Sequence, residues 1–131
     1  MAFYLDTSAA VKLVVAERHT AALVAWVAEH EADLVSSDLL RTELLRATRR
    51  GAPHVMTRAR AVLDAIALLT VPTSTFERAA EVDPDLLRSL DALHLAAALE
   101  LGDELRAFVT YDDRLTRAAE LHGITVLAPG T

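Results

Sequence analysis

Short apolar runs alternate along this chain with longer segments in which apolar residues recur at helical spacing. Each of the first two runs ends in small polar residues that cap helices well: Asp6, Thr7 and Ser8 after the first run, and Ser36, Ser37 and Asp38 after the second. The pattern predicts strands at residues 3–5, 34–35, 107–109 and 124–127, with only a weak strand at residues 71–72. Each predicted strand but the last leads into a predicted helix.

The helical segments show apolar rows with a period near 3.6 residues and end at glycines or turn residues. They predict helices at residues 9–13, 21–31, 39–50, 53 to about 69, 75–82, 90–101 and 112–122, with Ser89 as the cap of the sixth. Strands that alternate with helices pair in parallel through right-handed crossovers. We therefore expect one α/β domain over residues 1–131, with three layers: a central, mostly parallel sheet and helices on both faces.

The composition narrows the class of protein. The chain has 131 residues, 53% of them hydrophobic, and no cysteine, which excludes a disordered segment, a disulfide framework and thiolate metal sites. The sequence has no signal-peptide pattern and no apolar run near the roughly 20 residues that span a bilayer, so we expect a cytoplasmic protein without membrane contact. The formal net charge of −6 argues at first against a nucleic-acid partner.

Acidic residues occupy the positions that follow the predicted strands. In parallel sheets the ligand site lies at the carboxyl ends of the strands, so these positions carry functional weight. The strand-end acids are Asp6, Asp38, Asp112 and Asp113, and two further acids lie on apolar helical faces, Glu43 and Asp91. Several carboxylates meeting at one point would repel each other unless a cation lay between them.

Each acid also has an ordinary structural explanation. Asp6 is well placed to cap the first helix, and Glu43 could lie at a solvated helix edge and pair with Arg46. Asp91 could be a first-turn acid stabilised by the helix dipole. The chain has no cysteine and no pair of histidines at metal-ligand spacing, so a site built from these acids favours Mg²⁺ or Mn²⁺ over Zn²⁺. Metal-assisted hydrolysis of phosphodiester bonds is the chemistry that suits such a site.

Four motifs in order give the chain a specific resemblance to PIN domains, and in particular to VapC-type toxin ribonucleases of bacterial VapBC toxin–antitoxin pairs. The motifs are YLDTSA at residues 4–9, SSDLLRTELLRA at 36–47, LRSLDALHLAAA at 87–98 and FVTYDDRL at 108–115. The resemblance implies that four acids form the metal cluster and that two hydroxyls support it. The acids are Asp6, Glu43, Asp91 and Asp112, and the hydroxyls are those of Ser8 and Thr110.

The resemblance also separates neighbouring candidates. The Thr-x-Asp spacing from Thr110 favours Asp112 as the residue that faces the site, and Asp113 is expected to support it as a first-turn helix acid. Asp38 matches the family's cap of the helix that carries Glu43. His94 lies three residues after Asp91 and could face the site, but a histidine between two leucines is more often a packing residue.

A basic segment changes the first interpretation of the net charge. Residues 41–60 hold six arginines and one acid, for a local charge of +5. It is either a solvated helix surface or a rim that contacts RNA phosphates, and the rim candidates are Arg41, Arg46, Arg49 and Arg50. Few aromatic rings are available to stack on bases, the candidates being Tyr4, Tyr111 and Trp26.

The resemblance implies an activity and partners as well. We expect the toxin component of a type II toxin–antitoxin system, a Mg²⁺- or Mn²⁺-dependent endoribonuclease that is inhibited by a cognate VapB-type antitoxin and forms a homodimer. One alternative is a PIN domain that binds without catalysis. Another is a phosphoacceptor receiver domain, for which Lys12, the only lysine, lies in the wrong element.

Overall fold

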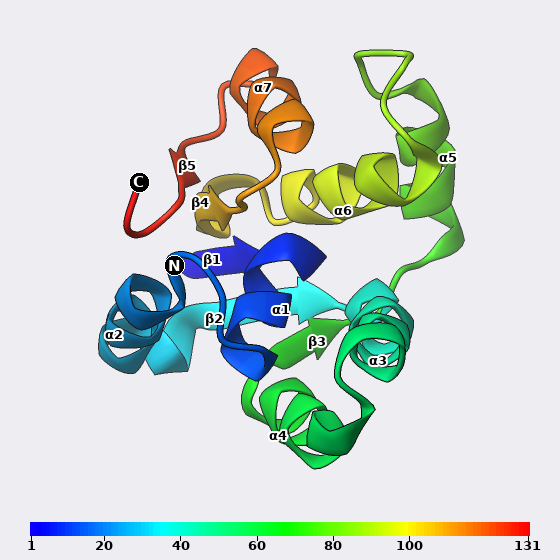
Figure 1. Ribbon diagram of the computed structural model, residues 1–131. Coiled ribbons are helices and arrows are strands. Elements are labelled where there is room, and N and C mark those ends of the chain that lie inside the picture. The colour runs from blue at the N-terminus through cyan, green and yellow to red at the C-terminus, as the bar shows by residue number, and fades with distance from the viewer.

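The fold is built on a five-stranded parallel sheet. A computed structural model describes all residues, 1–131. The strands pair in the order β3-β2-β1-β4-β5, every neighbouring pair parallel, and Figure 1 shows β1 and β2 in the middle of the molecule. Their bounds are β1 Ala2–Leu5, β2 Leu34–Ser37, β3 Ala67–Leu69, β4 Leu105–Val109 and β5 Val126–Leu127. The predicted parallel α/β architecture is confirmed.

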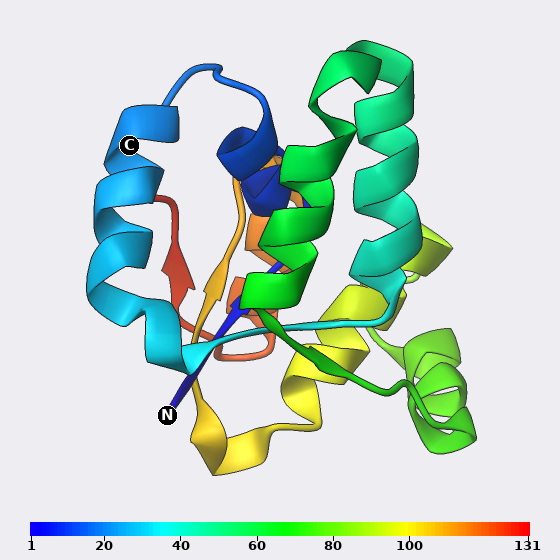
Figure 2. The ribbon, with the colours of Figure 1, turned by 90° about the horizontal axis from the view of Figure 1, so that it is seen from below.

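Seven α-helices and three short 3₁₀ segments connect the strands. The α-helices are α1 Thr7–Val14, α2 Thr20–His30, α3 Leu39–Gly51, α4 Met56–Ala65, α5 Thr73–Glu81, α6 Ser89–Leu99 and α7 Asp113–Leu121, and the 3₁₀ segments are η1 Glu31–Asp33, η2 Pro53–Val55 and η3 Gly102–Glu104. Figure 2 shows α2, α1, α4 and α3 side by side on one face of the sheet. Helices α6 and α7 cover the other face, and α5 packs on α6. None of these helices combines the length and the apolar character needed to cross a membrane.

Alternation along the central strand β1 divides the core between the two faces. Phe3 and Leu5 point into the cluster under α1 to α4, whereas Tyr4 points into the cluster under α6 and α7. Tyr4 is fully buried and its ring stacks on Phe108, with 5.3 Å between centroids. A strand buried on both faces is typical of a sheet covered by helices on each side.

The segment before α5 differs from the prediction. The long helix predicted from residue 53 to about 69 is wrong, because α4 ends at Ala65 and residues Ala67–Leu69 form β3. The apolar run around Ile66 fits a helical row as well as a strand, and pairing with β2 decides between them. The weak strand predicted at residues 71–72 is also wrong, since Pro72 is the residue that precedes α5.

Two predicted helix caps are wrong as well. Asp38 makes no capping hydrogen bond to α3, because its Oδ1 accepts from Arg41 Nε at 3.1 Å instead. Ser89 is the first residue of α6, and the extended residue before it is Arg88. The predicted stop at Gly123 is confirmed: this residue has φ 76° just after α7, in the left-handed region that glycine adopts without strain.

The carboxyl ends of the strands all lie at one edge of the sheet. The candidate residues that follow the strands therefore lie at this edge. Backbone pairing continues past the strands: Asp6 N donates to Val109 O at 3.2 Å, and Thr110 N donates to Leu127 O at 3.1 Å. Asp38 N likewise donates to Leu69 O at 2.9 Å. The sheet itself therefore fixes the backbone at Asp6 and Thr110.

The fully buried Leu44 of α3 tests the core. We expect Leu44→Ala to lower the free energy of unfolding by about 2–5 kcal/mol, because it removes buried methyl groups and leaves a cavity. The matched control is Leu86→Ala, at a leucine that is 92% exposed, where we expect a change within about 0.5 kcal/mol. Urea unfolding followed by circular dichroism measures both, and equal losses in the two variants would contradict this assignment of the core.

Candidate functional site

Asp6 is the most enclosed acid of the site. Its side chain is 3% exposed, and it caps α1 by accepting a hydrogen bond from Ala9 N at 3.1 Å. The same oxygen, Oδ1, accepts from Ser8 Oγ at 2.7 Å, and Oδ2 accepts from Thr110 Oγ1 at 2.6 Å. Asp6 is thus the helix cap that its position predicts and, at the same time, a buried carboxylate at the sheet edge.

The two hydroxyls that hold Asp6 also organise the turn between β4 and α7. Ser8 Oγ accepts from Tyr111 N at 2.9 Å, and Thr110 Oγ1 accepts from Asp112 N at 3.1 Å. The hydroxyls lie 3.3 Å apart. Because α1 and the β4–α7 turn share these contacts, the start of α7 is held against Asp6.

Asp112 and Asp113 have different surroundings. Asp112 is partly buried and caps α7, with its Oδ1 accepting from Leu115 N at 2.8 Å. After burial, which is the larger cause, the charge of Asp112 raises the pKa of Asp91. Asp113 is exposed in the first turn of α7, as predicted for a first-turn acid, and lines a separate cavity with Lys12 and Thr116.

Glu43 projects from α3 and meets His94 of α6. Glu43 Oε1 lies 2.5 Å from His94 Nε2, and His94 is 1% exposed. His94 Nδ1 lies 2.8 Å from Tyr4 Oη, which donates to Ser37 Oγ at 2.9 Å. His94 is therefore a buried histidine with satisfied hydrogen bonds, as expected for a packing residue, and one of its partners is the candidate acid Glu43. Its spacing of one helical turn from Asp91 was the available sequence signal.

Burial and repulsion raise the pKa of two of the four acids. Burial raises the pKa of Asp6, and the hydrogen bonds from Thr110 and Ser8 offset part of that effect. Burial, followed by the nearby charge of Asp112, raises the pKa of Asp91. Like charges thus contribute to the shift of Asp91, whereas the shift of Asp6 comes from burial.

Glu43 shows the opposite shift. Burial alone would raise the pKa of Glu43, but the hydrogen bond and the charge of His94 outweigh it and hold the pKa below its usual value. Tyr4 differs again, because burial raises the pKa of its phenol and keeps it protonated. Of the four acids, only Glu43 lies within ion-pair distance of a basic side chain, that of His94.

The donor chemistry of the site fits a hard divalent cation. Every candidate ligand is a carboxylate or hydroxyl oxygen, and Asp91 carries a charge that its neighbours Asp112 and Glu43 disfavour. In this structure no three acidic or histidine side chains lie close enough together to form a ready coordination sphere. Asp91 and Asp112 are only partly buried, so their side chains have room to turn toward a bound ion. The metal assignment therefore stays a prediction.

Two cavities adjoin the acids. One of about 620 Å³ lies between α3, α5 and the start of α6, and Glu43 and Thr7 form part of its wall beside Arg46 and Arg50. The other, of about 450 Å³, lies between α6 and α7 and holds Asp91. The second cavity has three arginines that the basic segment does not include: Arg88, Arg114 and Arg117.

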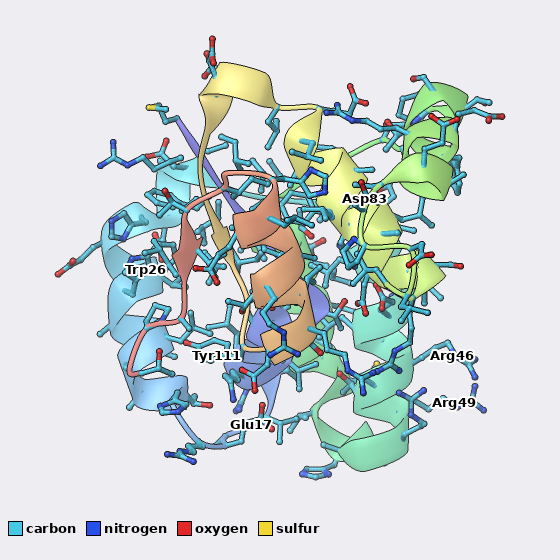
Figure 3. The ribbon with its side chains drawn as sticks, turned by 90° about the horizontal axis from the view of Figure 1, so that it is seen from above. Glu17, Trp26, Arg46, Arg49, Asp83 and Tyr111 are labelled. Carbon is cyan, nitrogen blue, oxygen red and sulfur yellow. The ribbon has the colours of Figure 1, made fainter.

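The four predicted rim arginines separate into two kinds. Arg41 forms an ion pair with Asp38 at 3.1 Å, whereas Arg46, Arg49 and Arg50 form none. Figure 3 shows Arg46 and Arg49 extending from α3 away from the body of the protein. Of the four, only Arg46 and Arg50 line the cavity beside Glu43.

The aromatic side chains and the lysine are engaged elsewhere. Tyr4 is buried, Trp26 packs edge-on against Phe3, and Tyr111 donates to Pro129 O at 2.8 Å. Lys12 lies on α1, where its Nζ contacts Glu17 and donates to Arg18 O at 2.8 Å. A receiver domain would need its lysine at a late strand beside the acids, so the structure gives that alternative no support.

Comparisons with known proteins show which family and which relatives this chain resembles. Residues 3–121 match the PIN domain family. Ribonuclease VapC47 of Mycobacterium tuberculosis (strain CDC 1551 / Oshkosh) is 40% identical over 131 residues, covering 97% of this chain and 96% of that protein. Ribonuclease VapC46 of the same species (strain ATCC 25618 / H37Rv) is 40% identical over 128 residues, covering 98% of each chain.

A solved structure agrees on the fold. The crystal structure of Mycobacterium tuberculosis VapC20, described as a sarcin-ricin loop cleaving toxin, superposes with a TM-score of 0.74 at 16% identity. The superposition covers 89% of this chain and 95% of that chain. At this identity the likeness concerns the fold, and it agrees with the parallel sheet described above.

The hydrogen bond from Thr110 to Asp6 gives a pH-dependent stability test. Because the pKa of Asp6 is raised in the folded state, the folded protein loses stability as the pH rises through that pKa. Thr110→Val removes a donor to the carboxylate and raises the pKa further, so we expect a loss of about 1–3 kcal/mol at pH 7. The loss should shrink as acid protonates Asp6.

Thr48→Val is the matched control, because the buried Thr48 hydroxyl donates to the neutral carbonyl of Leu44 at 2.8 Å. Its effect should not vary with pH. Urea unfolding of both variants between pH 3 and pH 8 makes the comparison. If the Thr110→Val loss were the same at every pH, the hydrogen bond to a charged Asp6 would be excluded.

Proposed function

This chain belongs to the PIN domain family, and on that premise we propose that it is a VapC-type toxin ribonuclease that hydrolyses RNA phosphodiester bonds with the help of Mg²⁺ or Mn²⁺. One observation carries the proposal: Asp6, Asp112, Asp91 and Glu43 come from four different elements to the same edge of the sheet. Burial raises the pKa of Asp91, and the charges of Asp112 and Glu43 raise it further, which supports the proximity of these three acids.

The four carboxylates are the residues that would hold the cation. When bound, a divalent ion supplies Lewis acidity for the attack of water on the phosphodiester. The chain's own part is to keep the acids in place: Ser8 and Thr110 orient Asp6, and the cap of α7 orients Asp112. No side chain needs to act as a covalent nucleophile.

We further propose that RNA lies across the two cavities beside the acids. Arg46 and Arg50 line the cavity on the Glu43 side, and three arginines line the cavity on the Asp91 side. None of these five arginines forms an ion pair within the protein, so each is free to contact a phosphate. Phosphate contacts supply affinity without reading sequence, and the few aromatic rings are already engaged, so RNA shape is the basis for selectivity that we propose.

The proposed protein partner is a cognate VapB-type antitoxin, acting with the toxin in the cytoplasm. The cavity beside Glu43 has apolar walls that suit a peptide: Leu39, Val71, Phe76 and Leu90. An antitoxin arginine or lysine reaching the acids would compete with the cation. We also propose a homodimer, the assembly that the resemblance to VapC-type toxins implies.

Substitution of the acids tests the proposed activity. We expect Asp6→Asn and Asp91→Asn each to lower RNA cleavage at least about 100-fold, more than the loss of an outer-shell partner costs. Asn keeps an oxygen that accepts from Ala9 N, so α1 stays capped in the first variant. Cleavage of purified ribosomal and transfer RNA with added Mg²⁺ or Mn²⁺, and growth arrest on expression, are the measurements.

The control for these variants is Asp64→Asn on the exposed face of α4, which should cleave RNA like the unaltered protein. Chelation with EDTA should stop cleavage in the unaltered protein. Retained cleavage in both site variants would refute the metal-site assignment. A chain that binds RNA but never cleaves it, with or without added metal, would instead fit the non-catalytic PIN module.

The salt dependence of RNA binding tests the arginine contacts. For single strands the slope of log affinity against log salt is about −0.7 per phosphate contact, so each lost contact should reduce its magnitude by about 0.7. We expect this reduction for Arg46→Gln, Arg50→Gln, Arg114→Gln and Arg117→Gln. Fluorescence anisotropy with a labelled RNA in EDTA measures binding without cleavage.

Arg106→Gln is the control, because Arg106 is exposed on β4 before the buried part of the strand and lines neither cavity. Its salt slope should equal that of the unaltered protein. If all five variants shared one slope, the phosphate path across the cavities would be wrong. A change confined to Arg46 and Arg50 would limit the path to the α3 side.

A further inference from the structure

A buried line of polar side chains runs from the interior of the sheet to Glu43. It passes from Ser37 of β2 through Tyr4 of β1 to His94 of α6, and its three contacts measure 2.9, 2.8 and 2.5 Å. Ser37 and Tyr4 are fully buried and His94 is 1% exposed. Glu43, at the end of the line, is the only member that is partly open to solvent.

The geometry of these hydrogen bonds shows how His94 can hold Glu43. The carboxylate of Glu43 only accepts, so His94 Nε2 donates to Oε1. His94 Nδ1 faces the phenol oxygen of Tyr4, which contacts Ser37 Oγ on its other side. The ring is therefore held between the phenol and the carboxylate, with an N–H directed at Glu43.

Packing alone does not account for this histidine. A buried polar side chain is costly unless it is hydrogen-bonded, and an apolar side chain would fill the same space without that cost. Both ring nitrogens of His94 are satisfied, one on each side, and no buried polar side-chain atom of the protein lacks a partner. This line of side chains ends at Glu43, and its effect is to fix the orientation of the Glu43 carboxylate.

We propose that His94 is a positioning residue: backed by Tyr4 and Ser37, it holds one carboxylate oxygen of Glu43 in a fixed orientation. This inference rests on the proposed function, in which Glu43 contributes to the cation site. Glu43 has three rotatable side-chain bonds, and the contact with His94 removes much of that freedom before a cation arrives. The lowered pKa of Glu43 agrees with a fixed, charged carboxylate.

Three substitutions grade the interaction. His94→Leu removes both hydrogen bonds, and His94→Gln keeps an N–H donor toward Glu43 in place of the imidazole ring. Tyr4→Phe removes only the hydroxyl behind the ring and keeps the stacking on Phe108. Thr48→Val is the control for the loss of a buried hydrogen bond on α3, where the hydroxyl donates to the backbone and does not contact the site.

The first readout is Mn²⁺ binding without RNA, measured by isothermal titration calorimetry, and the second is cleavage at saturating Mn²⁺. We expect His94→Leu to weaken Mn²⁺ binding and to lower kcat by about 10- to 100-fold, with KM for RNA changed less than twofold. Tyr4→Phe should show smaller losses, and His94→Gln should recover part of both. If His94→Leu lowers stability as Thr48→Val does while Mn²⁺ affinity and kcat stay unchanged, His94 only packs.

A double-mutant cycle separates this inference from the proposed function. In metal-free buffer we expect the urea midpoint shifts of His94→Leu and Glu43→Ala to be non-additive in the double variant, because each substitution removes the same contact. Additive shifts would overturn the pairing even in a fully active ribonuclease. Non-additive shifts in a chain that neither binds Mn²⁺ nor cleaves RNA would keep the pairing and reject the proposed function.

Discussion

The carboxylate of Asp6 accepts hydrogen bonds from two distant parts of the chain, and the geometry of the site depends on these contacts. Its two oxygens join the start of α1 to Thr110 at the end of β4, while its backbone N–H continues the pairing of β1 with β4. A buried charge without such donors would be costly. The hydrogen bonds of this one side chain therefore join the sheet, the first helix and the turn into α7.

The other acids gather around this fixed point at an electrostatic cost. The pKa of Asp91 is raised by burial and by Asp112, and the pKa of Asp6 is raised by burial. His94 binds the carboxylate of Glu43, and a cation would offset the negative charge of the acids. Acids with raised pKa values are common at functional sites, because the fold holds buried and like-charged groups together there.

Much of the fold could be predicted from the sequence, because its local signals agree with the tertiary structure. The strand and cap pattern at residues 3–8 and the acids after the strands pointed to the correct edge of the sheet. The β3 strand could not be found in this way, since the apolar row of α4 continues through Ile66 and only pairing with β2 makes residues Ala67–Leu69 extended. The cap at Asp38 failed because its side chain accepts from Arg41, three residues along the chain, and the cap at Ser89 is off by one residue, because α6 already includes it.

The candidate site was predicted by residue type and by resemblance, but its organisation was not. Nothing in the local pattern around His94 shows that Tyr4, 90 positions away, will support it. The arginines beside Asp91 also escaped, because Arg88, Arg114 and Arg117 are spread along the chain and meet only in the folded protein. The local pattern of one sequence does not show which distant segments come into contact in the folded protein.

The central claim is that the acids at this sheet edge bind a divalent cation. Anomalous diffraction from crystals grown with Mn²⁺ tests it most directly, since it locates the ion without reference to activity. The account predicts a strong peak in contact with carboxylate oxygens of Asp6, Asp91 and Asp112, beside a Glu43 still bound to His94. Crystals loaded with Mn²⁺ that show no peak at this edge, or only peaks on other residues, would contradict it.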